Sequence, residues 1–172
     1  MINYATIENS LYSWAYGLTS IETIFAHQTG TFMRPSTQYI LLNIVSITPR
    51  GIAESQADLL GDKTIDYSHS NVEEVFVSVN TFRDTALNLA STLKDSLARI
   101  TVQEDFYAQG IGYSRATAVN DIPEVIEKDF EQRGQFDCFF FVRSLDIENI
   151  NIIENVELTN ELDGVTTIIS KP

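Results

Sequence analysis

Paired carboxylates are the residues of this sequence most able to do chemistry, because two of them can act as acid and base or bind calcium. Three acidic pairs occur, at Glu73 and Glu74, at Glu124 and Glu127, and at Asp129 and Glu131. On a strand, positions 129 and 131 would share a face with Arg133, which favours an ion pair over a catalytic pair. We therefore assign no catalytic residue.

The histidines, the single cysteine and the remaining aspartates do not form a recognisable site either. His27 and His69 stand in unrelated contexts without the spacing of zinc ligands, and the three aspartates of 58–66 lack the spacing of a calcium loop. Cys138 lies in an apolar run, so we interpret it as a buried thiol. We expect neither a metal ion nor a cofactor.

Apolar residues at helical intervals predict two helices. One covers Ala5–Tyr16 and ends at Gly17, and the other, of about 16 residues, begins after an N-cap at Asp84. Strands are predicted at Ile21–His27, Tyr39–Ile47, Val72–Phe82, Ile111–Val119, Phe130–Arg143 and Ile150–Leu158. These elements predict an α+β fold, a mostly antiparallel sheet with two helices packed on one face.

The polar segment 52–70 interrupts this pattern between two predicted strands. Pro49-Arg50-Gly51 is expected to end the first strand, and Gly61-Asp62 to form a turn, so the segment predicts a long hairpin or arm. The tail at 160–172 has little to pack. We expect residues 1–172 to form a single domain.

The composition excludes several classes of function. The chain has 172 residues, 44% of them hydrophobic, and carries 24 acids against 11 lysines and arginines, a net charge of −13. Such acidity opposes tight binding to nucleic acid phosphates. No apolar run is long enough for a membrane helix, and Met1–Glu8 lacks the basic start of a secretory signal, so we expect neither.

Several short motifs, in a consistent order, resemble the neck and tail-terminator proteins of tailed bacteriophages. They are Trp14 before Gly17-Leu18-Thr19, Pro35 before Leu42-Asn43-Ile44, the strand 73–79, Thr81-Phe82-Arg83-Asp84 leading to Leu93-Lys94-Asp95-Ser96-Leu97, the segment 130–137, and 153–158. Each motif is weak alone, and the resemblance rests on their order over most of residues 5–158.

The resemblance implies a structural virion protein rather than an enzyme. Proteins of this family form six-fold rings that cap the finished tail tube and join it to the head connector or stopper. It therefore implies a hexamer, contacts with the tube protein and with the tail sheath, and assembly in the host cytoplasm. DNA would pass through the lumen of such a ring without specific binding.

Charged residues of the arm and of a later loop are the expected contacts in such a ring. The candidates for contact with a subunit or the tube are Glu54, Asp58, Asp62, Lys63 and Asp66, and those for the lumen are Asp121 and Glu124. Acids that line the lumen would repel passing DNA, whereas the alternative is that the acidity only keeps the protein soluble.

A second class of function stays open from the residues alone. The scattered acids are also compatible with a small acidic enzyme or ligand-binding domain. The mass in solution separates the two classes, because a ring protein forms an oligomer and a small enzyme need not.

Overall fold

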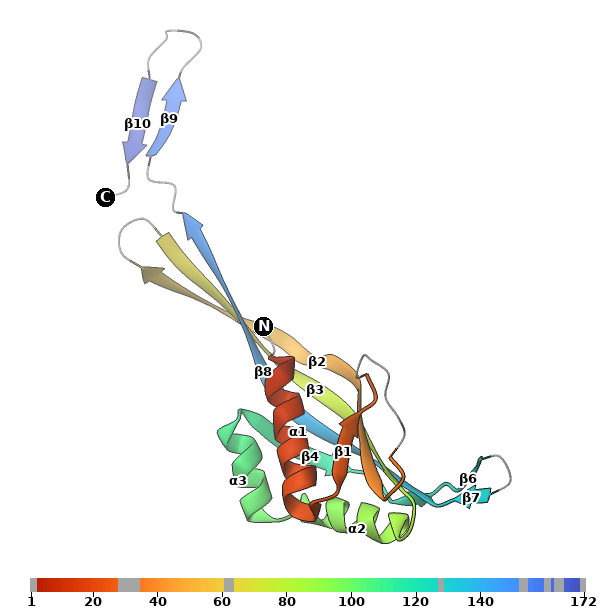
Figure 1. The fold of residues 1–172 in the computed structure, drawn as a ribbon. Coiled ribbons are helices and arrows are strands. Elements are labelled where there is room, and N and C mark those ends of the chain that lie inside the picture. The colour runs from red at the N-terminus through yellow and green to blue at the C-terminus, as the bar shows by residue number, and fades with distance from the viewer. Residues whose placement is uncertain are drawn as a thin grey trace. The chain divides into compact units, whose positions relative to one another are not determined.

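The computed structural model describes residues 3–27, 35–60, 64–126, 129–151, 155–159, 162 and 166–170. The chain divides into two compact units. The first unit comprises residues 1–51 and 71–144, and the second comprises 52–70 and 145–172. Three long strands, labelled β2, β3 and β8 in Figure 1, contribute residues to both units.

A mixed, mostly antiparallel sheet forms the first unit, in the strand order β1-β2-β3-β8-β4, with β5 also paired to β8. The strands are β1 Glu22–Phe25, β2 Tyr39–Leu60, β3 Thr64–Phe82, β4 Ile111–Ala116, β5 Asn120–Asp121 and β8 Arg133–Asn151. β1 runs parallel to β2, and both β4 and β5 run antiparallel to β8. A short antiparallel pair, β6 Glu124–Ile126 and β7 Asp129–Glu131, lies between β5 and β8 in the sequence.

Three helices pack on one face of this sheet (Figure 1). They are α1 Tyr4–Thr19, α2 Ala86–Ser96 and α3 Ile100–Ala108. The predicted α+β fold with a mostly antiparallel sheet is confirmed, and the helices number three rather than two because residues 97–99 divide the second predicted helix.

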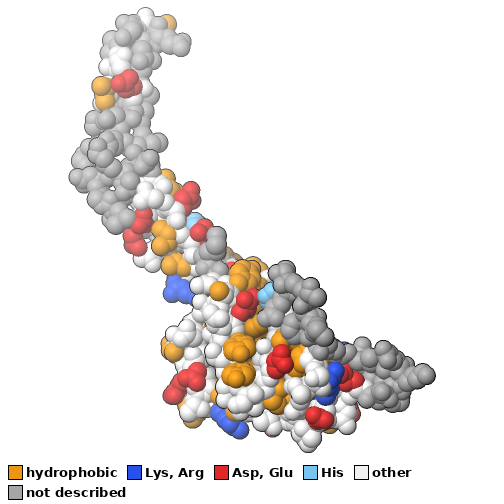
Figure 2. Space-filling model, viewed as in Figure 1, with side chains coloured by type: hydrophobic (Ala, Val, Ile, Leu, Met, Phe, Trp, Pro, Cys, Tyr) orange, Lys and Arg blue, Asp and Glu red, His pale blue; other side chains and the backbone are white. Residues whose placement is uncertain are grey.

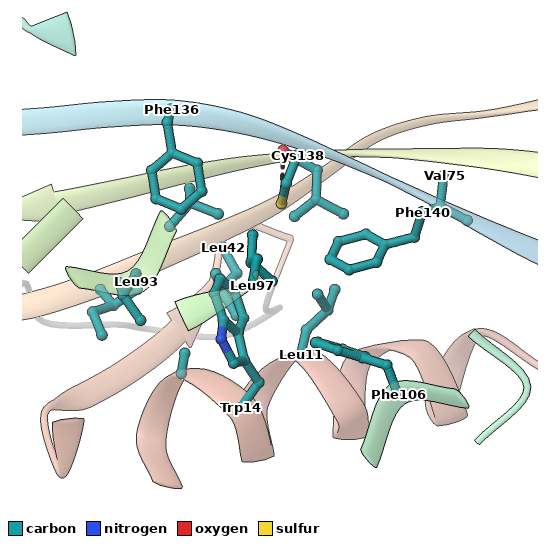
Figure 3. Packing of buried hydrophobic residues seen from close by; sticks show 14 of the residues in the cluster. Leu11, Trp14, Leu42, Val75, Leu93, Leu97, Phe106, Phe136, Cys138 and Phe140 are labelled. Carbon is teal, nitrogen blue, oxygen red and sulfur yellow. Dashed lines mark hydrogen bonds between the residues drawn. The ribbon is translucent and has the colours of Figure 1, made fainter. Parts of the chain in front are cut away.

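The core fills the space between the helices and the sheet. Val75, Val77 and Val79 of β3 are each fully buried, as the alternating pattern of that strand predicts. In Figure 3, Trp14 of α1, Leu93 of α2 and Phe106 of α3 lie between the helices and the sheet, and the ring centroids of Trp14 and Phe106 are 6.1 Å apart. Burial of these rings and aliphatic chains supplies the main stabilising free energy of the first unit.

Polar atoms inside this core are matched to partners. Trp14 Nε1 donates to Ser96 Oγ at 2.9 Å, and this bond joins α1 to the end of α2. Cys138 is fully buried, its Sγ lies 3.7 Å from the carbonyl oxygen of Val77, and burial raises the pKa of the thiol. The interpretation of Cys138 as a buried structural thiol is therefore confirmed.

The second unit contains the remaining residues of β2, β3 and β8 and a separate hairpin. Ser68 Oγ donates to Gln56 O at 3.3 Å, and Asn149 Nδ2 donates to Asp66 Oδ1 at 2.7 Å, so β2, β3 and β8 remain neighbours there. The hairpin pairs β9 Asn155–Thr159 with β10 Thr166–Ser170 in antiparallel register.

Several predicted strand limits were wrong. β3 begins at Thr64 rather than at Val72, β4 ends at Ala116 rather than at Val119, and β8 spans Arg133–Asn151 rather than Phe130–Arg143. β2 does not end at Pro49-Arg50-Gly51 but continues to Leu60, because Gly51 takes φ = +84°, a conformation open to glycine that lets the strand kink and continue. The single strand expected at Ile150–Leu158 is divided, with its first two residues ending β8 and its last four in β9; residues 152–154 lie outside the described part.

Two predicted helix limits were also wrong. α1 passes through Gly17 and ends at Thr19, where the C-cap Ser20, with a φ of 56° and a 2.7 Å bond from its N–H to Tyr16 O, closes the helix. Asp84 is not the N-cap of α2, because Arg83 and Asp84 both have positive φ and Thr85 occupies the cap position.

Gly134 allows the start of α2 to approach β8 closely. A Cβ atom there would lie 2.8 Å from Thr81 Oγ1 and 2.9 Å from Ala86 O. We expect Gly134→Ala to lower the free energy of unfolding by about 1–3 kcal/mol, measured by urea denaturation. Gly17→Ala is the control, because nothing lies within 4 Å of that Cβ and alanine should stabilise α1 by about 0.5–1 kcal/mol. Equal effects of the two substitutions would contradict the close approach.

Candidate interaction surface

The face of the sheet opposite the helices is held together by polar and aromatic side chains. We call it the polar sheet face and define it by Arg50, Glu74, Phe76, Ser78, Asn80, Arg115, Arg133, Gln135, Asp137 and Phe139. The rings of Phe76 and Phe139 stack with centroids 4.9 Å apart. Arg133 Nη2 donates to Asn80 Oδ1 at 2.9 Å, and Gln135 Nε2 donates to Ser78 Oγ at 3.1 Å.

A carboxylate between two arginines joins three strands on this face. Glu74 of β3 accepts from Arg50 of β2 at 2.5 Å and from Arg115 of β4 at 3.1 Å. The Glu74 side chain is only 8% exposed, whereas those of Arg50 and Arg115 are 54% and 53% exposed. The bonds from Arg50 and from Arg115 hold the pKa of Glu74 below its ordinary value, against the rise that burial causes.

The arginine side chains cover the aromatic part of the face. The guanidinium carbon of Arg115 lies 3.9 Å from the centroid of the Phe139 ring, a cation–π contact. The guanidinium carbon of Arg133 lies 5.3 Å from the centroid of Phe82. The face is therefore ordered by charged groups that still present much of their surface to solvent.

The sequence singled out Glu74 but not its partners. Arg50 lies 24 residues before it and Arg115 lies 41 residues after it, so local spacing gives no signal for this network. For Asp129 and Glu131, a cross-strand or same-face ion pair was predicted, with Arg133 on the same strand face. In the structure Glu131 Oε1 accepts from Arg83 Nε at 2.9 Å, and the side chain of Asp129 lies outside the described residues.

The predicted contact residues of the arm belong to the second unit. Glu54 and Asp58 are exposed on β2, where Asp58 accepts from Gln56 Nε2 at 3.1 Å, and Asp66 of β3 accepts from Asn149. Asp62 and Lys63 lie outside the described residues. In Figure 2 the coloured side chains around the β2–β3 hairpin include acidic and hydrophobic ones.

The two predicted lumen acids follow β4 in the chain. Asp121 is exposed at the end of β5, where its backbone pairs with Gly134 of β8. Glu124 begins β6, and its side chain lies outside the described part. The structure thus places them three residues apart in the first unit, whereas the arm residues belong to the second unit.

A groove between α1 and α3 has a volume of about 700 Å³. Trp14 and Phe106 lie among its apolar lining residues, and Asp105 is a carboxylate at its edge. Exposed tyrosines extend the apolar surface along α1, where Tyr12 and Tyr16 stack with centroids 5.4 Å apart. Figure 2 shows hydrophobic side chains over this helix-bearing face.

The histidines do not meet in a metal site. His27 Nε2 lies 2.8 Å from Glu8 Oε1 in the first unit, and His69 Nδ1 lies 2.9 Å from Ser55 Oγ in the second. Across the described ranges, no group of three or more histidine, cysteine or acidic residues is placed to hold a metal ion.

A family model of phage neck terminator proteins matches residues 5–164 of the sequence. The chain belongs to this family. The match spans both units, including the core strands, the polar sheet face and the arm. It confirms the resemblance to phage neck and tail-terminator proteins that the ordered motifs indicated.

The other comparisons add little to this assignment. No curated protein matches the sequence significantly. One of the solved chains that match shares 15% sequence identity, covers 83% of this chain and 96% of its own length, and has a TM-score of 0.39. At that score the likeness carries no argument about fold or function.

Membership of the terminator family makes the chain a structural phage neck protein that belongs to the virion and interacts with other head or tail proteins. Within the described residues, no helix combines the length and apolarity that a membrane crossing needs. The polar sheet face, the helix groove and the second unit are the surfaces that such interactions can use.

The network around Glu74 makes the stability of the first unit depend on pH. Because the folded pKa of Glu74 lies below its ordinary value of 4.5, the ion pairs stabilise the fold above that pH, and the benefit is lost as pH falls through the folded pKa. We expect Glu74→Gln to lower the free energy of unfolding at pH 7 and to differ less from wild type in acid, measured by urea unfolding at several pH values.

Glu104→Gln is the matched control, because Glu104 is exposed on α3. Its effect is expected to stay within about 0.5 kcal/mol. A loss for Glu74→Gln that is the same at pH 7 and at pH 3 would contradict the role assigned to the ion pairs.

Proposed function

We propose that copies of this phage neck protein form a ring, a hexamer, that caps the tail tube and joins it to the head connector or stopper protein. The match to the neck terminator family over residues 5–164 is the observation that carries the proposal. Contact with a tail sheath and assembly of the ring in the host cytoplasm belong to the same proposal. The segment 52–70 would act in it as an arm that contacts a neighbouring subunit or the tube.

A structural rather than catalytic role agrees with the surroundings of the candidate chemical groups. Glu74 and Glu131 are held in ion pairs with arginines, and the thiol of Cys138 is buried with a raised pKa. A carboxylate whose pKa is lowered, as at Glu74, and a buried thiol whose pKa is raised are poor acids, bases and nucleophiles at neutral pH, because each stays in one protonation state.

The net charge of −13 suits a ring through which DNA slides. Like charges on the lumen wall repel the phosphates and keep the DNA from binding to the wall. Asp121 and Glu124 are the proposed lumen acids.

Native mass spectrometry of the purified protein, with electron microscopy of assembled tails, tests the ring. We expect a species of six times the 19.3 kDa of one chain, in solution or on the tail tube, and density for it at the head-proximal end of the tail. A protein that stays monomeric and is also absent from purified virions would contradict the proposal.

Charge reversal of Asp121 and Glu124 tests the lumen. We expect Asp121→Lys with Glu124→Lys to leave the circular dichroism spectrum unchanged and to slow DNA ejection severalfold, because the lysines would bind passing phosphates. Ejection is followed by fluorescence of a DNA dye outside the particle.

The control reverses two exposed acids of the helices, Asp95→Lys with Glu104→Lys, and gives the same change in net charge. Normal ejection from the Asp121 and Glu124 variant would mean that these acids serve only solubility. Equal slowing in both variants would show that net charge, and not the lumen, is responsible.

A further inference from the structure

We infer that the ring is built head to tail: the acidic second unit of one copy docks on the polar sheet face of the next copy, with its carboxylates on Arg50 and Arg115. The inference rests on the proposed ring and names the two surfaces that would form it. Its occupant is a second copy of this chain, chosen because the two surfaces carry opposite charge.

The negative charge of the chain is concentrated in the second unit. That unit holds ten acids and two lysines, a net charge of −8 in 47 residues. The first unit, with 125 residues, carries the remaining −5. The two units of a subunit therefore differ strongly in net charge. The acidic second unit of one copy is attracted to a positive surface on the first unit of another copy.

The polar sheet face offers positive groups that a carboxylate can reach. Arg50 and Arg115 share Glu74, and their side chains remain 54% and 53% exposed. A guanidinium has five N–H donors, so the bond that each makes to Glu74 occupies only part of the set. With Arg133, three arginines face the two carboxylates of Glu74 and Asp137, which leaves this face positive within an acidic protein.

The arginines of the polar sheet face are already ordered before a partner binds. The Arg115 guanidinium lies over the ring of Phe139, which itself stacks on Phe76, so the guanidinium is held in place before a partner arrives. A group that is already ordered loses less conformational entropy on binding. An incoming carboxylate would meet a fixed donor beside a partly buried aromatic pair.

The second unit has apolar side chains that such a contact would cover. Ile52 is 98% exposed, and Ile147 and Ile168 are each 59% exposed. The β9–β10 hairpin is a sheet of two strands, and such hairpins are marginally stable in water unless they pack on another surface. Docking on a neighbour would bury apolar surface and bring the surrounding acids to the arginines.

A contact between two different surfaces is heterologous, so it adds one subunit after another until the ring closes. This property gives a test that needs two variants. The face variant is Arg50→Gln, Glu74→Gln and Arg115→Gln, which removes the three charges together and so does not leave the Glu74 carboxylate buried without its arginines. The unit variant is Glu54→Lys, Asp146→Lys and Glu148→Lys, all exposed residues of the second unit.

Each variant alone should be folded by circular dichroism and monomeric by native mass spectrometry. An equimolar mixture should form a species of two chains and grow no further, because only the second unit of the face variant and the polar sheet face of the unit variant can still meet. The control reverses three exposed acids of the first unit, Glu22→Lys, Asp95→Lys and Glu104→Lys, and should assemble as the wild type does.

The outcomes separate this contact from the ring itself. Rings from either variant alone, or a mixture that remains monomeric, would overturn the head-to-tail contact while the ring of the wild type stands. If the wild type assembles only on tails, each variant is scored for incorporation into virions, and normal incorporation of either would overturn the contact. A wild type that neither assembles nor enters virions would overturn the ring as well.

Discussion

Burial of one face of the central sheet is the constraint on which the rest of the structure depends. Val75, Val77 and Val79 can be covered only if all three helices lie on their side of β3, and Trp14 and Phe106 complete that layer. Because side chains alternate along a strand, the same packing turns the intervening residues of β3 to the other face. The hydrophobic core therefore decides where the arginine network can form.

Much of the fold was predictable because its signals are local. The spacing of the apolar residues in α1 and the alternation of buried and polar-face residues in β3 each repeat within a few residues. The order of apolar and polar residues in the sequence therefore reveals both elements. Wrong predictions of this kind depended on single residues that can either end a helix or strand or allow it to continue. Gly17 can end a helix or continue it, and the Pro49-Arg50-Gly51 run can end a strand or kink it. Packing beyond the local sequence decided both, since α1 and β2 continue past these residues.

The candidate surface was much less predictable than the fold. Glu74 could be noticed as an acid, but its partners come from strands that only the sheet order brings beside it. Glu131 was correctly expected in an ion pair, and the sequence did not indicate its partner Arg83, which is 48 residues away. Contacts of this kind carry no periodic signal in one sequence, so the order of the strands must be known before they can be named.

A subunit with a net charge of −13 must overcome its own repulsion to assemble, and a uniform charge would make every orientation of two copies unfavourable. The division of charge changes this balance. With −8 on the second unit and a positive sheet face on the first, one relative orientation gains attraction while others keep the repulsion. Repulsion thereby contributes to specificity, because it penalises contacts between like surfaces. In the proposed ring, such a subunit would meet its neighbours through two unlike surfaces, and repulsion between like surfaces would oppose symmetric pairing through either one.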